Sequence, residues 1–400
     1  MHSDFVVRSM RASFFVRLPF AVTVILALVA WTTPASAAMS GNCMTECSRA
    51  LQSTIKALNN RSPVAFNRMI DTDLIIKKSL SDLQLDTKYK EAFSAGLKKG
   101  LGNIGQRFLQ MMPEEHWAKV IRVKQYQDHV LGLVRLDYAD SGWGYLDLWL
   151  AKDSKGKVHI IDWYNYASGE LYTSSVKKVV VMTSLNPTLY GKMFDYVSGR
   201  ADELKVLNRY FATIQKKQYD QAYEIFKNMS VGLKKNRIFG IIAVSSANLS
   251  GNDDYYSDAL ANLAKYHGDD PTLAFLLIDH YFLTEDYEQA IRNLDSFQGY
   301  IDTPDAALEN LKAISWMKAG KNKLAIQHAS NGIRIEPELE PNYWTLFSIY
   351  TSTGKYSQAV AIGKELEKRF NYDLGPASLE KVADYRAFAK SAAYRRWHAN

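Results

Sequence analysis

The sequence predicts an α+β domain, with helices over a curved antiparallel sheet, followed by an all-α solenoid of helical hairpins. Two observations predict this class. Strand-like runs follow helix-like runs within residues 38–185, and an alanine-centred pattern then recurs up to residue 375. A chain of 400 residues is long enough for two or three domains, and its 47% hydrophobic and 23% charged content is that of a folded protein.

Residues 1–37 have the parts of a secretory signal peptide. The basic start contains Arg8, Arg11 and Arg17. The apolar run Phe20–Trp31 follows and leads to small residues that end at Ala37, near which we expect cleavage. This run is shorter than the about 20 residues that a helix needs to cross a bilayer. We therefore expect a periplasmic or secreted protein without stable membrane insertion after cleavage. The alternative is that this segment is an uncleaved N-terminal anchor. Translation starts at either Met1 or Met10.

Cys43 and Cys47, the two cysteines of the chain, come shortly after the expected cleavage point. An isolated pair can form a disulfide in an oxidising compartment. If the segment is helical, the two residues share a helix face with Cα atoms about 6 Å apart, within disulfide reach. A metal site is disfavoured because no histidine or third cysteine accompanies the pair. A local disulfide is predicted.

The charge balance disfavours a nucleic-acid partner. The formal net charge is +7, and removal of residues 1–37 leaves 46 basic and 41 acidic residues, a net of about +5. Nucleic-acid binding needs a concentrated basic face or a known module. The basic doublets are instead scattered, at Lys98-Lys99, Lys177-Lys178, Lys216-Lys217, Lys234-Lys235 and Arg395-Arg396. We expect these side chains on the solvated surface.

The N-terminal half begins with helices and continues with strands. Residues 48–115 carry apolar residues at helical spacing, and runs rich in β-branched and aromatic residues follow. Strands are predicted at Val120–Tyr126, Val130–Tyr138, Gly144–Ala151, Val158–Tyr166 and Val176–Met182. A turn at Asp153–Gly156 joins two of them as a hairpin. This order implies an α+β layer arrangement.

Two segments of this half, Phe66–Asp71 and Lys157–Tyr164, resemble the nuclear-transport-factor-two or SnoaL-like cone. The resemblance implies a curved sheet that can enclose a pocket, for which His129, Asp162 and Tyr164 are the candidates. A buried aspartate near a histidine is a plausible general base. The family fold hosts enzymes, ligand binders and interaction modules, so it implies no single function.

The strands carry four other polar candidates, namely Asp137, Tyr145, Asp147 and His159. Alternation places Asp162 with Tyr164, Arg135 with Asp137, and Tyr145 with Asp147 on shared faces. The alternative interpretation is that Arg135 pairs with a neighbouring carboxylate on a solvated face.

The C-terminal half contains an internal repeat. Its marker alanines are Ala222, Ala259, Ala290, Ala325 and Ala359, separated by 37, 31, 35 and 34 residues. Ala222, Ala290 and Ala359 each follow a turn, an aromatic residue and two polar residues. The segments before Ala259 and Ala325 are weaker copies of this pattern. The pattern resembles the tetratricopeptide (TPR) unit, whose period is 34 residues and whose alanine lies where two helices cross. Pro271 and Pro337, twelve residues after two of the alanines, match the proline that ends the second helix.

The match to the repeat is partial. The residues twelve after the other alanines are Lys234, Asp302 and Asn371, and the loop at Gly251–Asp254 looks about three residues too long. The last three units match best.

The TPR resemblance implies that first helices line a concave surface that holds a peptide or protein segment. The candidate partner-binding residues are Asp279, His280, Asn310, Lys312, Ser315, Asn342 and Tyr343. Ordinary solvated positions are the alternative for each.

No cofactor, metal or catalytic motif is expected. The segment Gly100–Gly105 matches GxGxxG, but that motif needs a preceding strand, and Tyr89–Lys99 has the pattern of a helix. HExxH, Cys/His ligand spacing and GxSxG do not occur in the sequence.

The sequence therefore predicts a non-catalytic interaction scaffold of the cell envelope, with a protein or peptide partner. A small-ligand-binding or hydrolytic cone with an accessory array is the alternative. The expected parts are a signal peptide (1–37), a cone-like domain (38–185), a linker helix (186–202), TPR-like repeats (203–375) and a capping helix (376–400).

Overall fold

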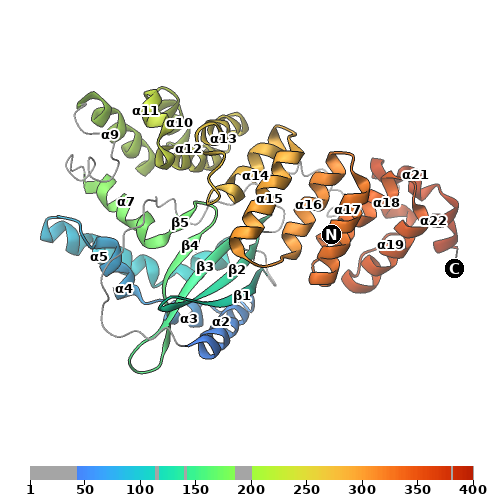
Figure 1. Ribbon diagram of the computed structural model, residues 1–400, viewed down its shortest axis with the longest axis horizontal. Coiled ribbons are helices and arrows are strands. Elements are labelled where there is room, and N and C mark those ends of the chain that lie inside the picture. Colours follow the sequence, from blue (N-terminus) through green and yellow to red (C-terminus); the bar gives the residue numbers. More distant parts are fainter. Residues whose placement is uncertain (1–42, 113–116, 139–141, 185–200, 380–381, 400) are drawn as a thin grey trace. The chain divides into compact units, whose positions relative to one another are not determined.

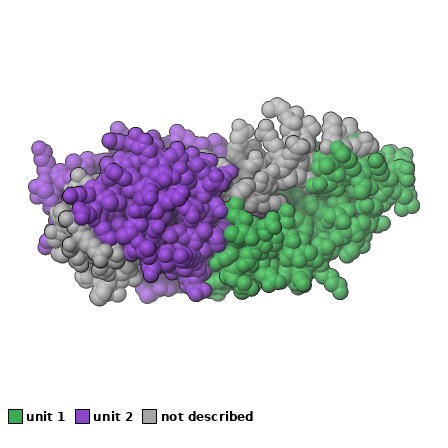
Figure 2. Space-filling view, turned by 90° about the horizontal axis from the view of Figure 1, so that it is seen from above, with its two compact units in different colours: residues 1–15, 281–400 green, residues 16–280 purple. Residues whose placement is uncertain are grey.

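The computed structural model describes residues 43–112, 117–138, 142–184, 201–379 and 382–399. The chain divides into two compact units (Figure 2). We call the described residues up to 280 the N-terminal unit and those from 281 onward the C-terminal unit. The predicted signal peptide lies outside the described residues, and so does the predicted linker helix as far as residue 200.

The N-terminal unit begins with helices, as predicted. They are α2 (Met44–Asn59), α3 (Val64–Met69), α4 (Thr72–Leu80), α5 (Thr87–Leu101) and α6 (Ile104–Met111). Asp71 and Asp86 cap α4 and α5, because each carboxylate accepts a hydrogen bond from a backbone N–H in the first turn. The GxGxxG match thus begins inside a helix, α5, and not after a strand.

A five-stranded antiparallel sheet follows, with its strands in chain order (Figure 1). The strands are β1 (Ala118–Tyr126), β2 (His129–Asp137), β3 (Trp143–Lys152), β4 (Val158–Asn165) and β5 (Glu170–Leu171). Four of the five predicted strands are confirmed. The short β5 was not predicted.

The predicted strand Val176–Met182 is wrong, because these residues belong to helix α7 (Tyr172–Ser184). Asp162 accepts a hydrogen bond from the backbone N–H of Thr173 and so helps to start the helix. Val176 and Val180, one helical turn apart, pack against Leu80 of α4. A helical face that a neighbouring helix buries has overridden the β propensity of the valines.

The two faces of the sheet differ in chemistry. On the face covered by α2 and α3, Val130, Val134 and Leu148 belong to the apolar core (Figure 1). Gly132 lets α2 lie close, because a Cβ there would overlap Leu51. The opposite face, which we call the outer face, carries polar and aromatic side chains that are also buried.

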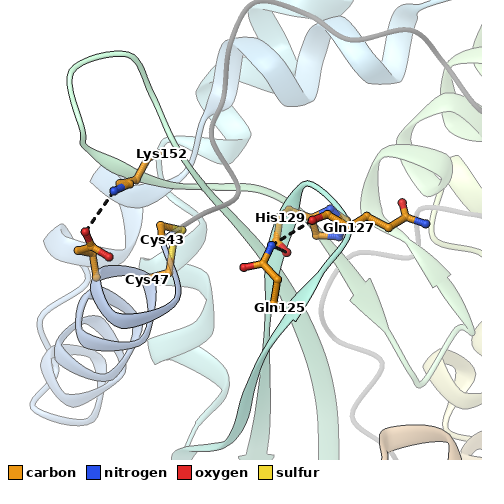
Figure 3. Close-up of a disulfide and its surroundings, with 7 residues drawn as sticks. Cys43, Cys47, Gln125, Gln127, His129 and Lys152 are labelled. Atoms are coloured by element: carbon orange, nitrogen blue, oxygen red, sulfur yellow. Dashed lines mark hydrogen bonds and ion pairs between the residues drawn. A yellow bond between two sulfur atoms is a disulfide. The ribbon is translucent and has the colours of Figure 1, made fainter.

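The disulfide between Cys43 and Cys47 confirms the predicted local pairing. It joins residue 43 to the first turn of α2, with the two Cα atoms 5.3 Å apart and both side chains fully buried (Figure 3). Lys152 Nζ at the end of β3 lies 3.1 Å from Glu46 Oε1. The disulfide thus fixes the residue before α2 to the first turn of the helix, and the ion pair fixes that turn to the sheet.

Helical hairpins make up most of the described chain from residue 201 to residue 370. The N-terminal unit holds α9 (Ala201–Gln215), α10 (Tyr219–Lys227), α11 (Val231–Lys235), α12 (Arg237–Ser250) and α13 (Asp253–His267), and α14 (Ala274–Leu283) continues into the C-terminal unit. The C-terminal unit holds α15 (Tyr287–Ile301), α16 (Ala306–Lys318), α17 (Asn322–Ile335), α18 (Pro341–Ser352) and α19 (Tyr356–Phe370). All five marker alanines are completely buried. Pro271 and Pro337 follow α13 and α17.

The hairpins repeat at a more regular spacing than the positions of the marker alanines suggest. A residue with positive φ precedes each second helix, at Lys217, Gly251, Glu285, Gly320 and Gly354, in steps of 34, 34, 35 and 34 residues. Each marker alanine lies five residues after its turn, except Ala259, which lies eight after Gly251. Tyr256 occupies the equivalent position in α13. The predicted three-residue insertion near Gly251 is therefore wrong, because the alanine is displaced by one helical turn.

The predicted capping helix 376–400 is a series of short elements. These are α20 (Pro376–Leu379), a 3₁₀ turn (Ala383–Tyr385), α21 (Arg386–Ala389) and α22 (Ala392–Trp397). Tyr385 and Phe388 pack edge-on against Phe347 of α18. Together these elements bury the apolar surface of the last hairpin, which a further repeat would otherwise cover.

Glycine substitutions test the close packing of α17 on α18. A Cβ at Gly332 would overlap the side-chain amide of Asn342, whereas a Cβ at Gly299 in α15 meets no atom within 4 Å. We expect Gly332→Ala to lower the free energy of unfolding by about 1–3 kcal/mol through overpacking. Gly299→Ala should raise it by about 0.5–1 kcal/mol, because alanine loses less entropy in a helix. Urea unfolding measures both, and equal effects would contradict the packing.

Candidate functional site

The structure does not bring the predicted partner-binding residues to an open surface. His280 is half-buried, and the other six are buried. All seven lie on first helices of hairpins, α14, α16 and α18, where the repeat predicted them. Asp279 and the five candidates on α16 and α18 make hydrogen bonds within the fold.

Two asparagines join the first helices of consecutive hairpins. Asn310 of α16 donates from Nδ2 to Thr345 Oγ1 of α18 at 2.9 Å, and Asn342 of α18 donates to the carbonyl oxygen of Ala306 at 3.2 Å. Asn310 is 1% exposed and Asn342 is fully buried. A buried amide is costly unless it is hydrogen-bonded, so these contacts help to set the spacing of the two helices.

Lys312 belongs to a charged network that connects three helices. Its Nζ lies 2.7 Å from both Asp295 Oδ1 and Gln298 Oε1 of α15, and 3.8 Å from Glu309 Oε1. Glu309 Oε2 contacts His328 Nδ1 of α17 at 2.9 Å. Burial favours the neutral acid, but the His328 hydrogen bond and the Lys312 charge outweigh it, so the pKa of Glu309 is lowered. The Lys312 ammonium is thus engaged within the fold.

Ser315 and Tyr343 are also engaged internally. Ser315 Oγ donates to the carbonyl oxygen of Leu311, one turn earlier in α16, and Tyr343 Oη donates to the carbonyl oxygen of Pro337. In α14, the Asp279 carboxylate accepts a hydrogen bond of 2.7 Å from Tyr256 Oη.

The three pocket candidates make three separate sets of contacts. His129 stacks on Trp149, with ring centroids 4.2 Å apart, and its Nδ1 lies 2.9 Å from Asp128 Oδ1. Burial lowers the pKa of His129, although Asp128 opposes this shift. Tyr164 packs edge-on against Tyr166, with centroids 5.0 Å apart.

Asp162 holds the start of α7. Its carboxylate accepts hydrogen bonds from Thr173 Oγ1 at 2.6 Å, from Thr173 N at 3.2 Å and from Trp163 N at 2.9 Å. The side chain is fully buried, and this burial raises the pKa of Asp162 to about 6 against the opposing effect of the hydrogen bonds. A capping role accounts for the two contacts with Thr173, and the third contact is made within β4.

Asp147 is the more unusual carboxylate of the outer face. Arg122 Nη2 and Tyr166 Oη lie 2.9 Å and 3.2 Å from its Oδ2. Burial raises its pKa, and Arg122 opposes the shift. Within the described part of the chain, Asp147 Oδ1 and His129 Nε2 are buried without a hydrogen-bond partner. Alternation placed Asp147 on a shared face, but only the register, which aligns Arg122, Leu133 and Asp147, identifies Arg122 as its partner.

Arg135 and His159 also differ from what the sequence predicted for them. Arg135 is buried, so the solvated face proposed for it is wrong. His159 contacts Asp153 of the β3–β4 turn at 3.0 Å.

A buried ion pair that the sequence did not reveal lies between β5 and α7. Lys178 Nζ is 3.0 Å from Glu170 Oε2, and Ser175 Oγ donates to Glu170 Oε1 at 2.8 Å. Burial, with a smaller effect of the Arg237 charge, depresses the pKa of Lys178. The expectation that the Lys177-Lys178 doublet is solvated is therefore wrong for Lys178, which is completely buried.

Arg237, at the start of α12, connects the sheet domain to the hairpins within the N-terminal unit. Its Nη2 donates to the carbonyl oxygen of Gly169 at 3.2 Å and to Thr272 Oγ1 at 2.8 Å, and its Nε lies 2.9 Å from Asp270 Oδ2. Nearby, the ring of Phe275 from α14 lies 5.1 Å from that of Tyr145. The structure thus identifies a specific joint between the two kinds of fold.

The described residues contain neither of two further kinds of site. None of their helices is both long and apolar enough to span a membrane. In the same residues, no cluster of three or more His, Cys, Asp or Glu side chains is placed to hold a metal ion.

Comparisons with known proteins show remote likenesses. No protein-family model and no curated protein sequence matches the chain. The solved structures that are similar to parts of it include the following two. PilW, a widely conserved type IV pilus biogenesis factor, has 14% identity over 50% of this chain and 92% of its own, with a TM-score of 0.34. A mutant of MamA has 13% identity over 42% of this chain and 96% of its own, with a TM-score of 0.31.

The pKa of Asp162 generates a pH prediction. Its folded-state pKa of about 6 exceeds the value of about 3.9 for an unfolded chain, so the folded state binds the proton more tightly. This contribution to stability is complete below pH about 4 and is lost as the pH rises through about 6. Asn keeps an acceptor for Thr173 N and carries no charge. We expect Asp162→Asn to gain stability relative to the wild type between pH about 4 and about 7.

Urea unfolding of both proteins at the two pH values measures this gain. If the difference in unfolding free energy between Asp162→Asn and the wild type stays constant with pH, the prediction is contradicted.

Proposed function

We propose that the chain is an exported, non-catalytic interaction protein of the cell envelope, which holds a protein or peptide partner through a TPR-like solenoid. The observation that carries this proposal is the repeated hairpin, with its turns spaced by 34 or 35 residues and its crossing alanines buried. Stacked hairpins offer an extended surface, which is suited to holding a polypeptide. In this proposal the sheet domain is a cone-like module attached to the array.

The contacts of the polar residues also support a binding function over catalysis. Asp162 caps a helix, Lys178 and Glu170 form a buried ion pair, and Lys312 joins three helices. Each of these groups has a structural role that needs no substrate.

The proposed address rests on two observations. The N-terminal sequence has the parts of a signal peptide, and the disulfide between Cys43 and Cys47 suits an oxidising compartment such as the periplasm or the outside of the cell.

Exposed apolar residues of the C-terminal unit offer a test. Tyr300 of α15 and Leu324 of α17 are 43% and 37% exposed, and Val64 of α3 in the sheet domain is 48% exposed and serves as a control. We expect the mature chain to recover a specific partner from cell envelope by crosslinking and affinity capture. The double variant Tyr300→Ser/Leu324→Ser should reduce recovery about tenfold, as removal of interface anchors does, whereas Val64→Ser should not.

Two outcomes would contradict the proposal. One is that no specific partner is recovered. The other is that Val64→Ser removes the partner and the double variant does not, which would place binding on the sheet domain.

A second candidate function is a ligand-binding or hydrolytic site on the outer face. The specific observation in its favour is the buried, unpartnered oxygen of Asp147 beside Arg122 and Tyr166. Native folds pair most buried polar atoms, and exceptions are often functional. This function predicts hydrolysis of p-nitrophenyl acetate that falls about 100-fold in Asp147→Asn. The same substitution at Asp73, which is exposed on α4, is the control. Background rates for the wild type would rule out this esterase activity.

A further inference from the structure

The structure points to an interaction surface at the starts of α12 and α14, whose partner is a β-turn of the chain's own sheet domain. We call this the docking surface and define it by Arg237, Asp270, Thr272 and Phe275. All four residues lie in the N-terminal unit, and so does the β4–β5 turn, which Arg237 contacts. We propose that the early hairpins bind the sheet domain in cis through this surface.

Contacts among the hairpin residues hold the docking surface in place. Asp270 Oδ1 accepts hydrogen bonds from Thr272 N and Thr272 Oγ1, at 2.9 Å and 2.6 Å, and Asp270 Oδ2 lies 2.9 Å from Arg237 Nε. Burial would raise the pKa of Asp270, but the Thr272 hydrogen bonds and the Arg237 charge lower it, so the carboxylate is ionised. The guanidinium is thus held by residues of the hairpins, with Nη2 pointing to the sheet domain.

The turn that Arg237 contacts joins β4 to β5 and requires glycine. Gly169 has φ +68°, a conformation that favours glycine, and its carbonyl oxygen accepts the hydrogen bond from Arg237. A Cβ at this position would lie 2.6 Å from Arg237 Nη2 and 2.8 Å from the carbonyl oxygen of Thr272. Both distances are too short for a methyl group, so the turn fits only because it lacks a side chain.

Flanking contacts extend the docking surface on both sides of the turn. The ring of Tyr145 from β3 packs edge-on against that of Phe275, with centroids 5.1 Å apart. The buried Glu170–Lys178 pair follows the turn directly and lies close enough for the Arg237 charge to depress the pKa of Lys178. A fork of N–H donors, a side-chain-free turn and an aromatic contact together form a specific recognition site.

This inference deepens the proposed function and rests on it in one respect. If the array holds a polypeptide, the starts of α12 and α14 are already occupied by a segment of the same chain. An external partner must then use other hairpins.

Hydrogen exchange of the full chain tests the inference with a matched pair of glycines. Gly156 in the β3–β4 turn also has a positive φ, +79°, but a Cβ there meets no atom within 4 Å. Gly156→Ala and Gly169→Ala both place alanine at a positive φ, so the cost of the backbone conformation is the same. Only Gly169→Ala also disrupts docking. We expect Gly169→Ala to accelerate amide exchange about tenfold or more in residues 166–175 and also in residues 235–245, which come from opposite sides of the joint. Gly156→Ala should leave both segments unchanged.

Arg237→Met is the second variant, in case Gly169→Ala fails to fold. Arg209→Met is its control, on an exposed position of α9. Faster exchange in both segments for Arg237→Met, with no change for Arg209→Met, supports docking. Faster exchange only in residues 235–245 would overturn it, because Arg237 would then merely stabilise the start of its own helix. Neither result depends on an external partner, so failure here is distinguishable from failure of the proposed function.

Discussion

The hairpins depend on one backbone constraint, a residue in the left-handed conformation between the two helices of each pair. Gly251, Gly320 and Gly354 meet it without steric cost, whereas Lys217 and Glu285 adopt it with a Cβ present. The spacing of these residues sets the lengths of the helices and the positions where they cross. The crossing position tolerates Tyr256 in α13, so the turn, and not the alanine, defines the repeat.

Polar side chains inside the fold serve mainly to position helices. Asn310 and Asn342 join first helices, the Lys312 network joins three consecutive helices, and Asp162 starts α7. Breaking such buried pairs is costly because it leaves an unpaired charge or amide. These groups are therefore already engaged by contacts within the fold.

The joint at Arg237 connects the sheet domain to the first hairpins. A sheet domain and a helical array joined only by a linker would move independently. Here one guanidinium contacts Gly169 on the sheet side and Asp270 and Thr272 on the hairpin side, and the aromatic contact of Tyr145 with Phe275 adds apolar area. The sheet domain is consequently a part of the same compact unit as the first hairpins.

The sequence by itself determined the helices before the sheet, four strands, the local disulfide and the hairpin repeat, because each depends on periodicity or on spacing within a few residues. Only the tertiary structure decided the rest. Val176 and Val180 became helical through packing on α4, Lys178 became buried through Glu170, and Asn310 and Asn342 turned into the interior. The pairing of Arg122 with Asp147 required the strand register, which no single strand contains. Such features depend on contacts between segments far apart in the chain, and local patterns carry no information about them.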